Sequence, residues 1–495
     1  MTAFKLCAPA RVGMAGSFDS TSTVSAVGDP LQSILDLFVT ARAAVGPPEW
    51  TWVQANTNDI TDVFPPVGLR DPFSGGEGIL QMVPAWGGHV FNPDALAAEV
   101  NGTGHSAAGC TEWFRWSLAT RQWSLSYYGA EQIACPAPYY RARDFNGTPP
   151  SHHPYDTQCY GKVRQRVYQA YAGTFNSGNR GRVWRPSEPG VQSNGADGQP
   201  GANFTGIFEI DMTLAGTGRV VGATGTNAAS GANAGTSLPG ANAALLHDWY
   251  GAGGPAPFFE GQTQALTIES SMAYTDEVPG KDAFYWTAGN KWLIRTTINS
   301  SNPADDTHEL ICRDGSVYGA GRGSVQISFD PVRRVVLAVT NDADTNPGCI
   351  KFADLKRTLG ASNGWRDATL TGPDIAEFLA LNRLDMGCKY DPISGKHLLY
   401  NGVGRQVWAI TTPTGNPTPD TGHVLEKLPM NAAQPAPPAS ADPFQTVGQV
   451  PGADFIIGIN GNWQHHDDVR AQCAILGRQG DVWYLLGPAW TDPRT

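Results

Sequence analysis

The sequence has few charged residues and no long apolar run, and each shortage excludes a class of protein. Lys, Arg, Asp and Glu make up 16% of the 495 residues, below the roughly one quarter that is typical of globular chains. The formal net charge of −11 argues against a phosphate-backbone binder, because such proteins gather Lys and Arg. No stretch approaches the run of about 18 apolar residues that spans a membrane. We therefore expect neither direct recognition of a nucleic-acid sequence nor membrane insertion.

Several functional motifs are also missing. None of the eight cysteines forms a Cys-x-x-Cys pair, and the first residues lack the apolar core of a signal peptide. Free buried thiols and a cytoplasmic location are therefore the default expectations, since disulfides belong to oxidising compartments. The sequence contains no Walker A, His-Glu-x-x-His or Rossmann fingerprint. It predicts no catalytic residue and no cofactor, and an enzyme is less expected than a non-enzymatic protein.

Glycine and proline are abundant, at 58 and 37 residues, which indicates many turns and disfavours a helical fold. One amphipathic helix is nevertheless predicted after a small-residue arm at 1–28. Asp29 and Pro30 suit its start, and Gly46 with the prolines after it ends it. Apolar residues repeat on one face at helical spacing: Leu31, Ile34, Leu35 and Phe38. We take residues 1–47 as an N-terminal arm and helix.

From residue 48 onward the pattern changes to short strands, and one unit recurs. In this unit an aromatic or apolar residue precedes a turn of Asp, Asn, Pro or Gly, and an apolar strand follows. The markers are Asn92, Asp156, Tyr274, Asp330, Asp391 and Pro451, with spacings of 64, 118, 56, 61 and 60. The long spacing contains a Gly/Ala/Asn-rich insertion at about 190–262, in which 206–211 is predicted to be a strand.

Six repeats of several strands each are typical of a β-propeller, because one small sheet cannot bury both of its faces alone. The fold class predicted is therefore all-β, with residues 48–495 forming six blades. The segment 49–53 precedes the first full unit. It is expected to complete the last blade and so to close the ring by pairing the two ends of the chain.

The first unit resembles kelch repeats. Gly87-Gly88-His89 is followed by Gly102-Thr103-Gly104-His105 and by a strand that leads to Trp123. The chain is thus similar to galactose-oxidase-like, kelch-type six-bladed propellers, and the His105 to Glu112 spacing resembles propeller proteins of bacteria and their phages. The copper chemistry of galactose oxidase is not implied, because the sequence has no Tyr-His dipeptide.

Two sets of residues are candidates for ligand binding at the rim of the ring. His152 and His153 precede the second unit, where they form either a blade-entry loop or a ligand-facing rim. Trp249 and Trp463 could form a platform on which the apolar face of a sugar stacks, although such residues also pack between blades.

Two further segments have metal-ligand chemistry, although no bound metal is expected. His465, His466 and Asp467 are the densest cluster of imidazole and carboxylate groups. Neighbouring residues of a strand point to opposite faces, so at most half of this cluster could hold one ion unless the segment is a loop. A polar loop at the rim of the propeller is the simpler interpretation. Asp342 and Asp344 alternate as in calcium loops, but the glycine and the twelfth residue do not fit that loop.

The leading functional hypothesis is a non-enzymatic structural component of a phage virion, located in the tail as a nozzle or as a fibre or host-recognition module. It implies contacts with other virion proteins, a homo-oligomer and a host surface glycan as a further ligand. The first alternative is a bacterial kelch-type propeller that binds or acts on carbohydrate. The second is an intracellular kelch-type scaffold for protein interactions. The fold itself favours none of these, because propellers support many functions.

Overall fold

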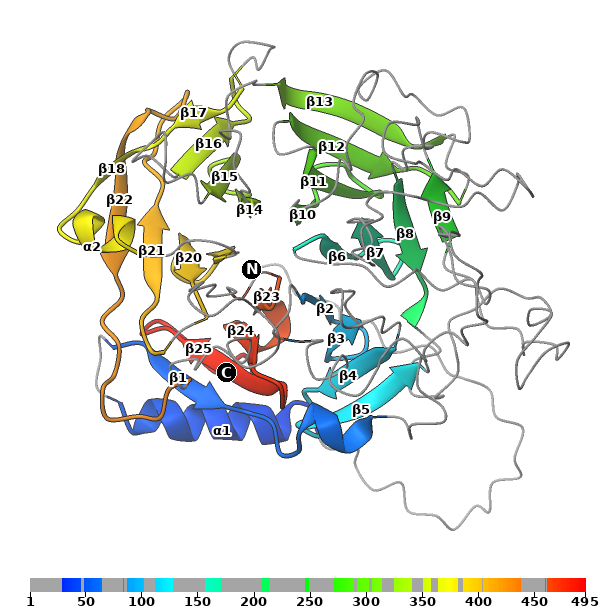
Figure 1. Ribbon diagram of the computed structural model, residues 1–495, viewed down its shortest axis with the longest axis vertical. Coiled ribbons are helices and arrows are strands. Elements are labelled where there is room, and N and C mark those ends of the chain that lie inside the picture. The colour runs from blue at the N-terminus through cyan, green and yellow to red at the C-terminus, as the bar shows by residue number, and fades with distance from the viewer. Residues whose placement is uncertain are drawn as a thin grey trace, which may run out of the picture.

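The computed structural model describes residues 29–45, 49–64, 83, 87–101, 112–127, 156–170, 206–212, 245–248, 271–288, 292–301, 305–313, 325–340, 350–357, 364–381, 386–402, 404–437, 459 and 461–495. These residues form six sheets arranged around a common axis (Figure 1). The prediction of an all-β, six-bladed propeller is confirmed. In the described part of the chain, no helix is long and apolar enough to cross a membrane.

The first three blades follow one another along the chain. Blade 1 contains β2 (His89–Asn92), β3 (Ala97–Asn101), β4 (Trp113–Ser117) and β5 (Gln122–Tyr127). Blade 2 contains β6 (Gln158–Gly161), β7 (Arg166–Ala170), β8 (Gly206–Ile210) and β9 (Leu245–Asp248). Blade 3 contains β10 (Met272–Thr275), β11 (Asp282–Ala288), β12 (Trp292–Ile298) and β13 (Thr307–Arg313).

The last three blades complete the ring. Blade 4 contains β14 (Val325–Asp330), β15 (Val335–Thr340), β16 (Ile350–Asp354) and β17 (Arg366–Asp367). Blade 5 contains β19 (Gly387–Asp391), β20 (Lys396–Tyr400), β21 (Trp408–Thr411) and β22 (Thr421–Lys427), and β18 (Thr369–Thr371) pairs parallel to β22. Blade 6 contains β23 (Trp463–His466), β24 (Ala471–Leu476), β25 (Asp481–Leu486) and, from the other end of the sequence, β1 (Thr51–Gln54).

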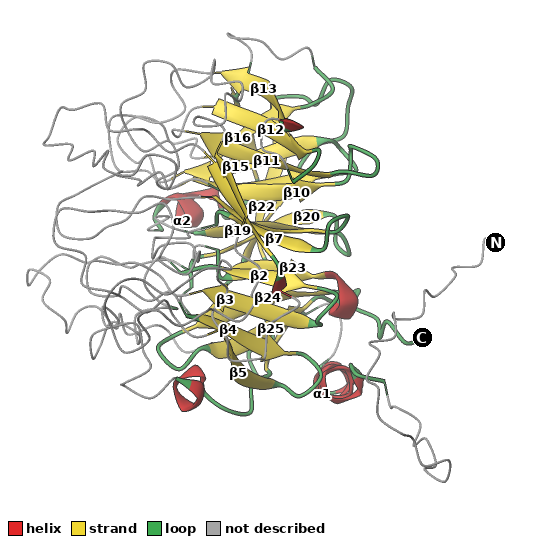
Figure 2. Cartoon of the chain, turned by 90° about the vertical axis from the view of Figure 1, so that its right-hand side faces the viewer, coloured by secondary structure: helices red, strands yellow, loops and turns green. Residues whose placement is uncertain are grey.

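The first strand of every blade lies innermost, and each inner strand contacts the next around the axis. Parallel bridges join Gly88 to Gly461 and Asp156 to Ser271, so these inner strands run in the same direction. The turns that follow the inner strands therefore lie at one end of the axis. Figure 2 shows the sheets edge-on, with α1 (Gln32–Ala43) and α2 (Ile375–Leu379) toward opposite sides.

The turn after each inner strand explains the repeat seen in the sequence. In every blade a residue with positive φ stands just before the second strand: Leu96, Gln165, Gly280, Arg334, Gly395 and Arg470. An Asp or Asn at the end of the inner strand holds the turn in three blades. Asp330, for example, accepts backbone hydrogen bonds from Val332 and Arg333, each 2.9 Å long. This side-chain cap is the physical basis of the markers Asn92, Asp330 and Asp391.

Blade 2 takes its turn cap from its neighbour. Gly161 occupies the position of Asn92 or Asp330, and the Asp282 carboxylate of blade 3 accepts from the backbone nitrogens of Val163 (2.8 Å) and Arg164 (3.0 Å). A Cβ on Gly161 would lie 2.5 Å from Cγ of Asp282. Glycine is therefore required there for the neighbouring carboxylate to reach the turn.

The predicted closure by the two ends of the chain is present. β1 pairs antiparallel with β25, so that Thr51 faces Leu486 and Gln54 faces Trp483. The predicted helix is α1, which packs against this blade and buries Ile34, Leu35 and Phe38. An aromatic contact helps to hold the helix there, since the Phe38 centroid lies 5.0 Å from that of Tyr484 and the two rings are tilted.

Of the insertion the structure describes only a small part, and of the arm none. The strand expected at 206–211 is β8, which ends at Ile210. The arm at 1–28 and most of 190–262 lie outside the described residues, as does the marker Pro451. The inner strand of blade 6 is β23, which starts twelve residues beyond Pro451. The sixth unit was therefore counted correctly, although its marker is not on the strand that forms the blade.

Candidate functional site

One cavity lies on the axis of the ring, at the end where the inner strands finish. Its volume is about 320 Å³, and all six inner strands or their turns contribute lining residues. This follows from the fold, because six parallel inner strands converge on one axis and deliver their last residues to the same place. We call this cavity the axial pocket.

Aromatic side chains make up much of the wall of the axial pocket. They come from five blades: Phe91, Tyr160, Tyr274, Phe329 and Tyr390. Phe91, Tyr274 and Tyr390 are only partly buried, so their rings remain accessible from the pocket. The Tyr160 hydroxyl donates to the Asp94 carboxylate, which fixes that ring at the edge of blade 1.

Charged side chains surround the mouth. Lys162 of blade 2 forms an ion pair of 3.2 Å with Asp467 of blade 6, and both side chains are more than half exposed. The Lys162 ammonium also lies 5.7 Å from the centre of the Tyr274 ring. An exposed pair of this kind contributes about 0–1 kcal/mol, so a ligand can displace it at little cost. Asp276 of blade 3 is the other carboxylate among the described lining residues.

A buried ion pair lies beneath the pocket. The Lys389 ammonium is 2.7 Å from the Asp156 carboxylate, which also accepts from the Ser271 hydroxyl and, at 3.1 Å, from the Gln464 amide. Burial raises the pKa of Asp156, and the charge of Lys389 acts against that rise. These four side chains come from four different blades, so the ion pair fixes the relative positions of those blades at the base of the axial pocket. With these partners, Asp156 is not placed to act as a free general base.

His465 lies between the axial pocket and a second cavity. Its Nδ1 is 3.1 Å from the Gln472 amide and 3.6 Å from the Asp391 carboxylate, while its Nε2 lies 3.7 Å from Asp467. Burial lowers the pKa of His465, and the carboxylates of Asp391 and Asp467 act against this. A largely neutral imidazole can both donate and accept a hydrogen bond toward a ligand.

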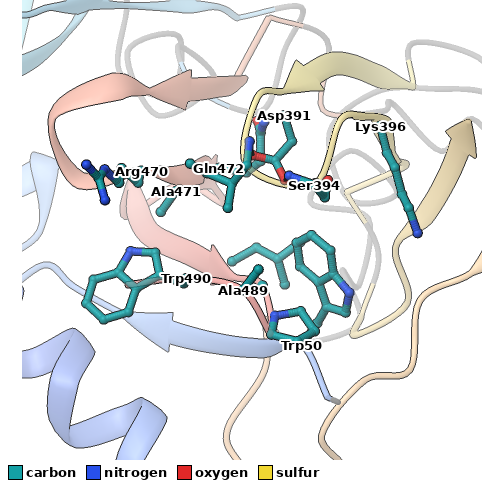
Figure 3. A pocket seen from close by; sticks show the side chains of 13 residues that line it. Trp50, Asp391, Ser394, Lys396, Arg470, Ala471, Gln472, Ala489 and Trp490 are labelled. Carbon is teal, nitrogen blue, oxygen red and sulfur yellow. Dashed lines mark hydrogen bonds between the residues drawn. The ribbon is translucent and has the colours of Figure 1, made fainter. Parts of the chain in front are cut away.

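The second cavity, also about 320 Å³, lies between blades 5 and 6. Figure 3 shows Trp50 and Trp490 on one side of it, with Asp391, Ser394 and Gln472 opposite them. Both indoles are mostly buried, and Trp490 Nε1 donates to the Val469 carbonyl at 2.8 Å. This lateral cavity is thus lined largely by side chains that already serve the packing of blade 6.

The predicted cluster at 465–467 is divided by the strand, as its alternation requires. His465 and Asp467 line the axial pocket. His466 points instead into the interface of blades 6 and 1, where its Nε2 lies 3.2 Å from Nε2 of His89. His89 was not among the predicted ligands, because 377 residues separate it from His466 and only ring closure brings them together.

The structure places one predicted rim residue in the core. Trp463 is fully buried between Trp52 and Tyr400, with ring centroids at 5.9 and 5.4 Å, and its Nε1 donates to the Leu398 carbonyl. It occupies the packing position that the sequence left open as an alternative. His152, His153, Trp249, Asp342 and Asp344 lie outside the described residues.

Sequence reasoning did not find the aromatic wall or the buried ion pair. Tyr274 and Asp156 were noticed only as markers of the repeat, and Lys389 was not singled out. A signal was nevertheless present, because Phe91, Phe329 and Tyr390 each stand one residue before the Asn or Asp that caps the turn. A recurring aromatic at that position of the inner strand predicts rings gathered at one end of the axis.

No family model matches this chain, and no curated protein matches it. Among solved structures, one similar chain is described as a GH43 β-1,3-galactosidase with galactodeoxynojirimycin. It has 11% sequence identity and a TM-score of 0.32, over 71% of this chain and 92% of that chain. Another is described as Bacteroides ovatus xyloglucan PUL GH43B, with 9% identity and a TM-score of 0.25, over 76% of this chain and 56% of that one.

These comparisons correct the leading functional hypothesis. The sequence favoured a non-enzymatic phage tail component, whereas both solved structures are described as GH43 proteins and neither as part of a virion. The virion interpretation has no support in these comparisons and is not pursued. The likeness is too low to transfer an activity to this chain, so its function must be argued from its own residues.

Proposed function

We propose that this protein binds a saccharide in the axial pocket. The observation that carries the proposal is the wall itself, in which partly exposed aromatic rings of three blades stand beside hydrogen-bonding side chains of blade 6. Phe91, Tyr274 and Tyr390 supply the rings, and Gln464 and His465 supply polar groups. This is the carbohydrate alternative that the sequence left open, here proposed for a particular pocket.

The chemistry of this wall suits a sugar better than an apolar ligand or a simple ion. One face of a pyranose ring carries C–H groups that pack on an aromatic ring, while its edge carries hydroxyls that need donors and acceptors. A pocket of about 320 Å³ falls at the small end of the range for small-molecule sites. Its size fits one or two sugar units.

The carboxylates that line the axial pocket favour saccharide binding over glycoside hydrolysis as the first hypothesis. Glycoside hydrolysis commonly uses two carboxyl groups on either side of the scissile bond. Among the described lining residues the carboxylates are Asp276 and Asp467, and Asp467 is engaged by Lys162. Asp156 is held by Lys389 beneath the floor. Hydrolysis is thus a separate outcome to be measured.

The finer assignment of the ring as kelch-type also stays a proposal. Gly87 and Gly88 directly precede the inner strand of blade 1, and Trp123 lies on its outer strand. Trp123 Nε1 donates to the Gly480 carbonyl of blade 6 at 2.9 Å. A tryptophan that joins adjacent blades in this way supports the kelch-type interpretation, which comparison of the other blades would test.

A glycan array followed by calorimetry tests the proposal. The wild type is expected to bind a defined set of saccharides, and Tyr274→Ala is expected to weaken binding about tenfold, the effect of losing roughly 1.4 kcal/mol. Ile393→Ala, at a partly exposed residue that lines the lateral cavity, is the matched control and should bind as the wild type does. A reducing-sugar assay on bound oligosaccharides then separates binding from hydrolysis.

Two results would overturn the proposal. Absence of binding to any saccharide by a folded wild type would remove it. Equal loss in Tyr274→Ala and Ile393→Ala, or loss only in the second, would move the site away from the axis.

A further inference from the structure

Three side chains of metal-binding type converge at the interface of blades 1 and 6, and none of them lines either of the two cavities described above. They are His89 of β2, His466 of β23 and Cys473 of β24, and all three are fully buried. One ligand atom from each lies within 4.8 Å of the others. The axial pocket does not include them, since His466 points to the opposite side of β23 from His465.

We propose that His89, His466 and Cys473 form a structural site for one divalent transition metal ion of the zinc type. Imidazole and thiolate are both donors that zinc binds, and three of them leave the fourth position of a tetrahedral ion to another ligand such as water. The same three donors also suit copper. The Nε2 atoms of the histidines face each other at 3.2 Å. Two nitrogens bound to one tetrahedral zinc at about 2.0–2.1 Å would be about 3.3 Å apart, so the imidazoles already stand at the right separation.

The group behind His466 also fits a metal site. A metal-bound imidazole is commonly oriented by a hydrogen bond to its other nitrogen. The Tyr484 hydroxyl lies 2.7 Å from Nδ1 of His466, which holds Nε2 of that ring toward His89. Among the described residues, Nδ1 of His89 is buried without a hydrogen-bond partner. Nε2 of His89 is placed instead by its 3.2 Å contact with Nε2 of His466.

Protonation states determine what happens when the ion binds. An imidazole binds a metal ion as the neutral ring, through the lone pair of one nitrogen, and a cysteine binds it as the thiolate. Binding then breaks the S–H bond, forms the metal–sulfur bond and releases one proton to solvent, which leaves the site with a net charge of +1.

The position of the cluster suggests what the ion would do. His466 and Cys473 belong to blade 6, which β1 completes, whereas His89 belongs to blade 1. The metal would therefore join the first and last blades of the ring, across a sequence separation of 377 residues between the histidines. It would stabilise closure, and it would reach the proposed saccharide site only through Phe91, whose ring stacks on His466 with centroids 4.2 Å apart.

Metal analysis and cobalt titration test this site. Elemental analysis of protein purified without chelator should find one ion of the zinc type per chain. After chelation, Co²⁺ should bind at one equivalent, give a thiolate-to-cobalt charge-transfer band and release one proton. The visible d–d bands then report whether the coordination is tetrahedral. EDTA is expected to lower the melting temperature of the wild type by several degrees.

A matched pair of cysteine variants locates the effect. Cys473→Ser should abolish the charge-transfer band and the response to EDTA. Cys388→Ser changes another fully buried cysteine, in blade 5, and should leave both unchanged. If Cys473→Ser does not fold, the titration of the wild type still decides.

The proposal is wrong if the folded wild type contains no metal and gives no cobalt spectrum. The two histidines would then be a hydrogen-bonded neutral pair. It is also wrong if Cys388→Ser removes the band.

Discussion

At the scale of single residues, two buried carboxylates of this protein bind partners from other blades. Asp156 of blade 2 meets Lys389 of blade 5, and Asp282 of blade 3 caps a turn of blade 2. Truncating one member of a buried ion pair typically costs about 3–5 kcal/mol, because the other charge loses its partner. The polar residues of the ring therefore tie the blades together at defined points.

Buried histidines give this fold a predictable dependence on pH. His397 of blade 5 is fully buried, and its Nδ1 lies 2.8 Å from the Ser328 hydroxyl of blade 4. Burial lowers the pKa of His397 to about 4, against the opposing charge of Asp330. The pKa of His397 is lower in the folded state than the usual value of about 6.5 that applies in the unfolded chain. The contribution of this histidine to the free energy of unfolding is therefore complete above pH 6.5 or so, and it is lost as the pH falls from there toward 4.

We predict that His397→Gln weakens this dependence. Glutamine stays neutral at every pH, so the variant lacks the cost of keeping an imidazole uncharged. Between pH 7.5 and 4.5 the wild type should lose about 2–3 kcal/mol more of its free energy of unfolding than the variant does. Urea denaturation at several pH values measures both, and carboxylates common to the two proteins cancel in the difference. Equal losses would show that His397 is not held neutral.

At the scale of elements, α1 and β1 attach the N-terminal part of the chain to the last blade. Phe38 is fully buried against Tyr484 and lies 5.8 Å from the ring of Trp490. Val39, the next residue, is 41% exposed. The helix therefore contributes through one apolar face, as its sequence pattern predicts.

These neighbours provide a matched test of that attachment. Phe38→Ala should lower the free energy of unfolding by about 3–5 kcal/mol, since it removes a buried ring and leaves a cavity. Val39→Ala should change it by less than about 0.5 kcal/mol. Chemical denaturation with tryptophan fluorescence reports both. A small effect of Phe38→Ala would mean that α1 docks through other contacts.

The elements were predictable to the extent that they depend on local pattern. The apolar spacing at Ile34, Leu35 and Phe38 predicted α1, and the turn residues Asp330 and Asp391 predicted the blades. The structure places His465 and His466 on β23 and so on two faces, where the sequence favoured a polar loop. Contacts between blades could not be read in this way: Lys389 and Asp156 are 233 residues apart, and no local signal joins them. The candidate site was therefore visible only as separate markers.

At the scale of the whole molecule, closure of the ring depends on a strand from the opposite end of the chain. Without β1, blade 6 would keep three strands and expose the edge of β25. Trp52 of β1 also packs on Tyr400 of blade 5, with ring centroids 5.1 Å apart. Loss of β1 would therefore also remove a contact of blade 5, because Trp52 packs on Tyr400 of that blade.

Complementation by a peptide tests this dependence. We expect the chain from residue 58 onward to lose its cooperative thermal transition. A peptide of residues 29–57, which carries α1 and β1, should restore the transition when added in excess. The same peptide with Trp52→Asp should fail, since it would bury an unpaired charge. A cooperative transition in the shortened chain alone would show that closure by β1 is dispensable.

The register of β1 against β25 also determines how the ring would respond to mechanical force. Thr51 lies opposite Leu486, and Gln54 lies opposite Trp483, so the chain enters and leaves blade 6 at the same end of this strand pair. A force that pulled these two points apart would load the hydrogen bonds one after another, as in opening a zipper, and not all at once in shear. The contact that closes the ring would thus resist heat through its buried area and yet open readily under tension.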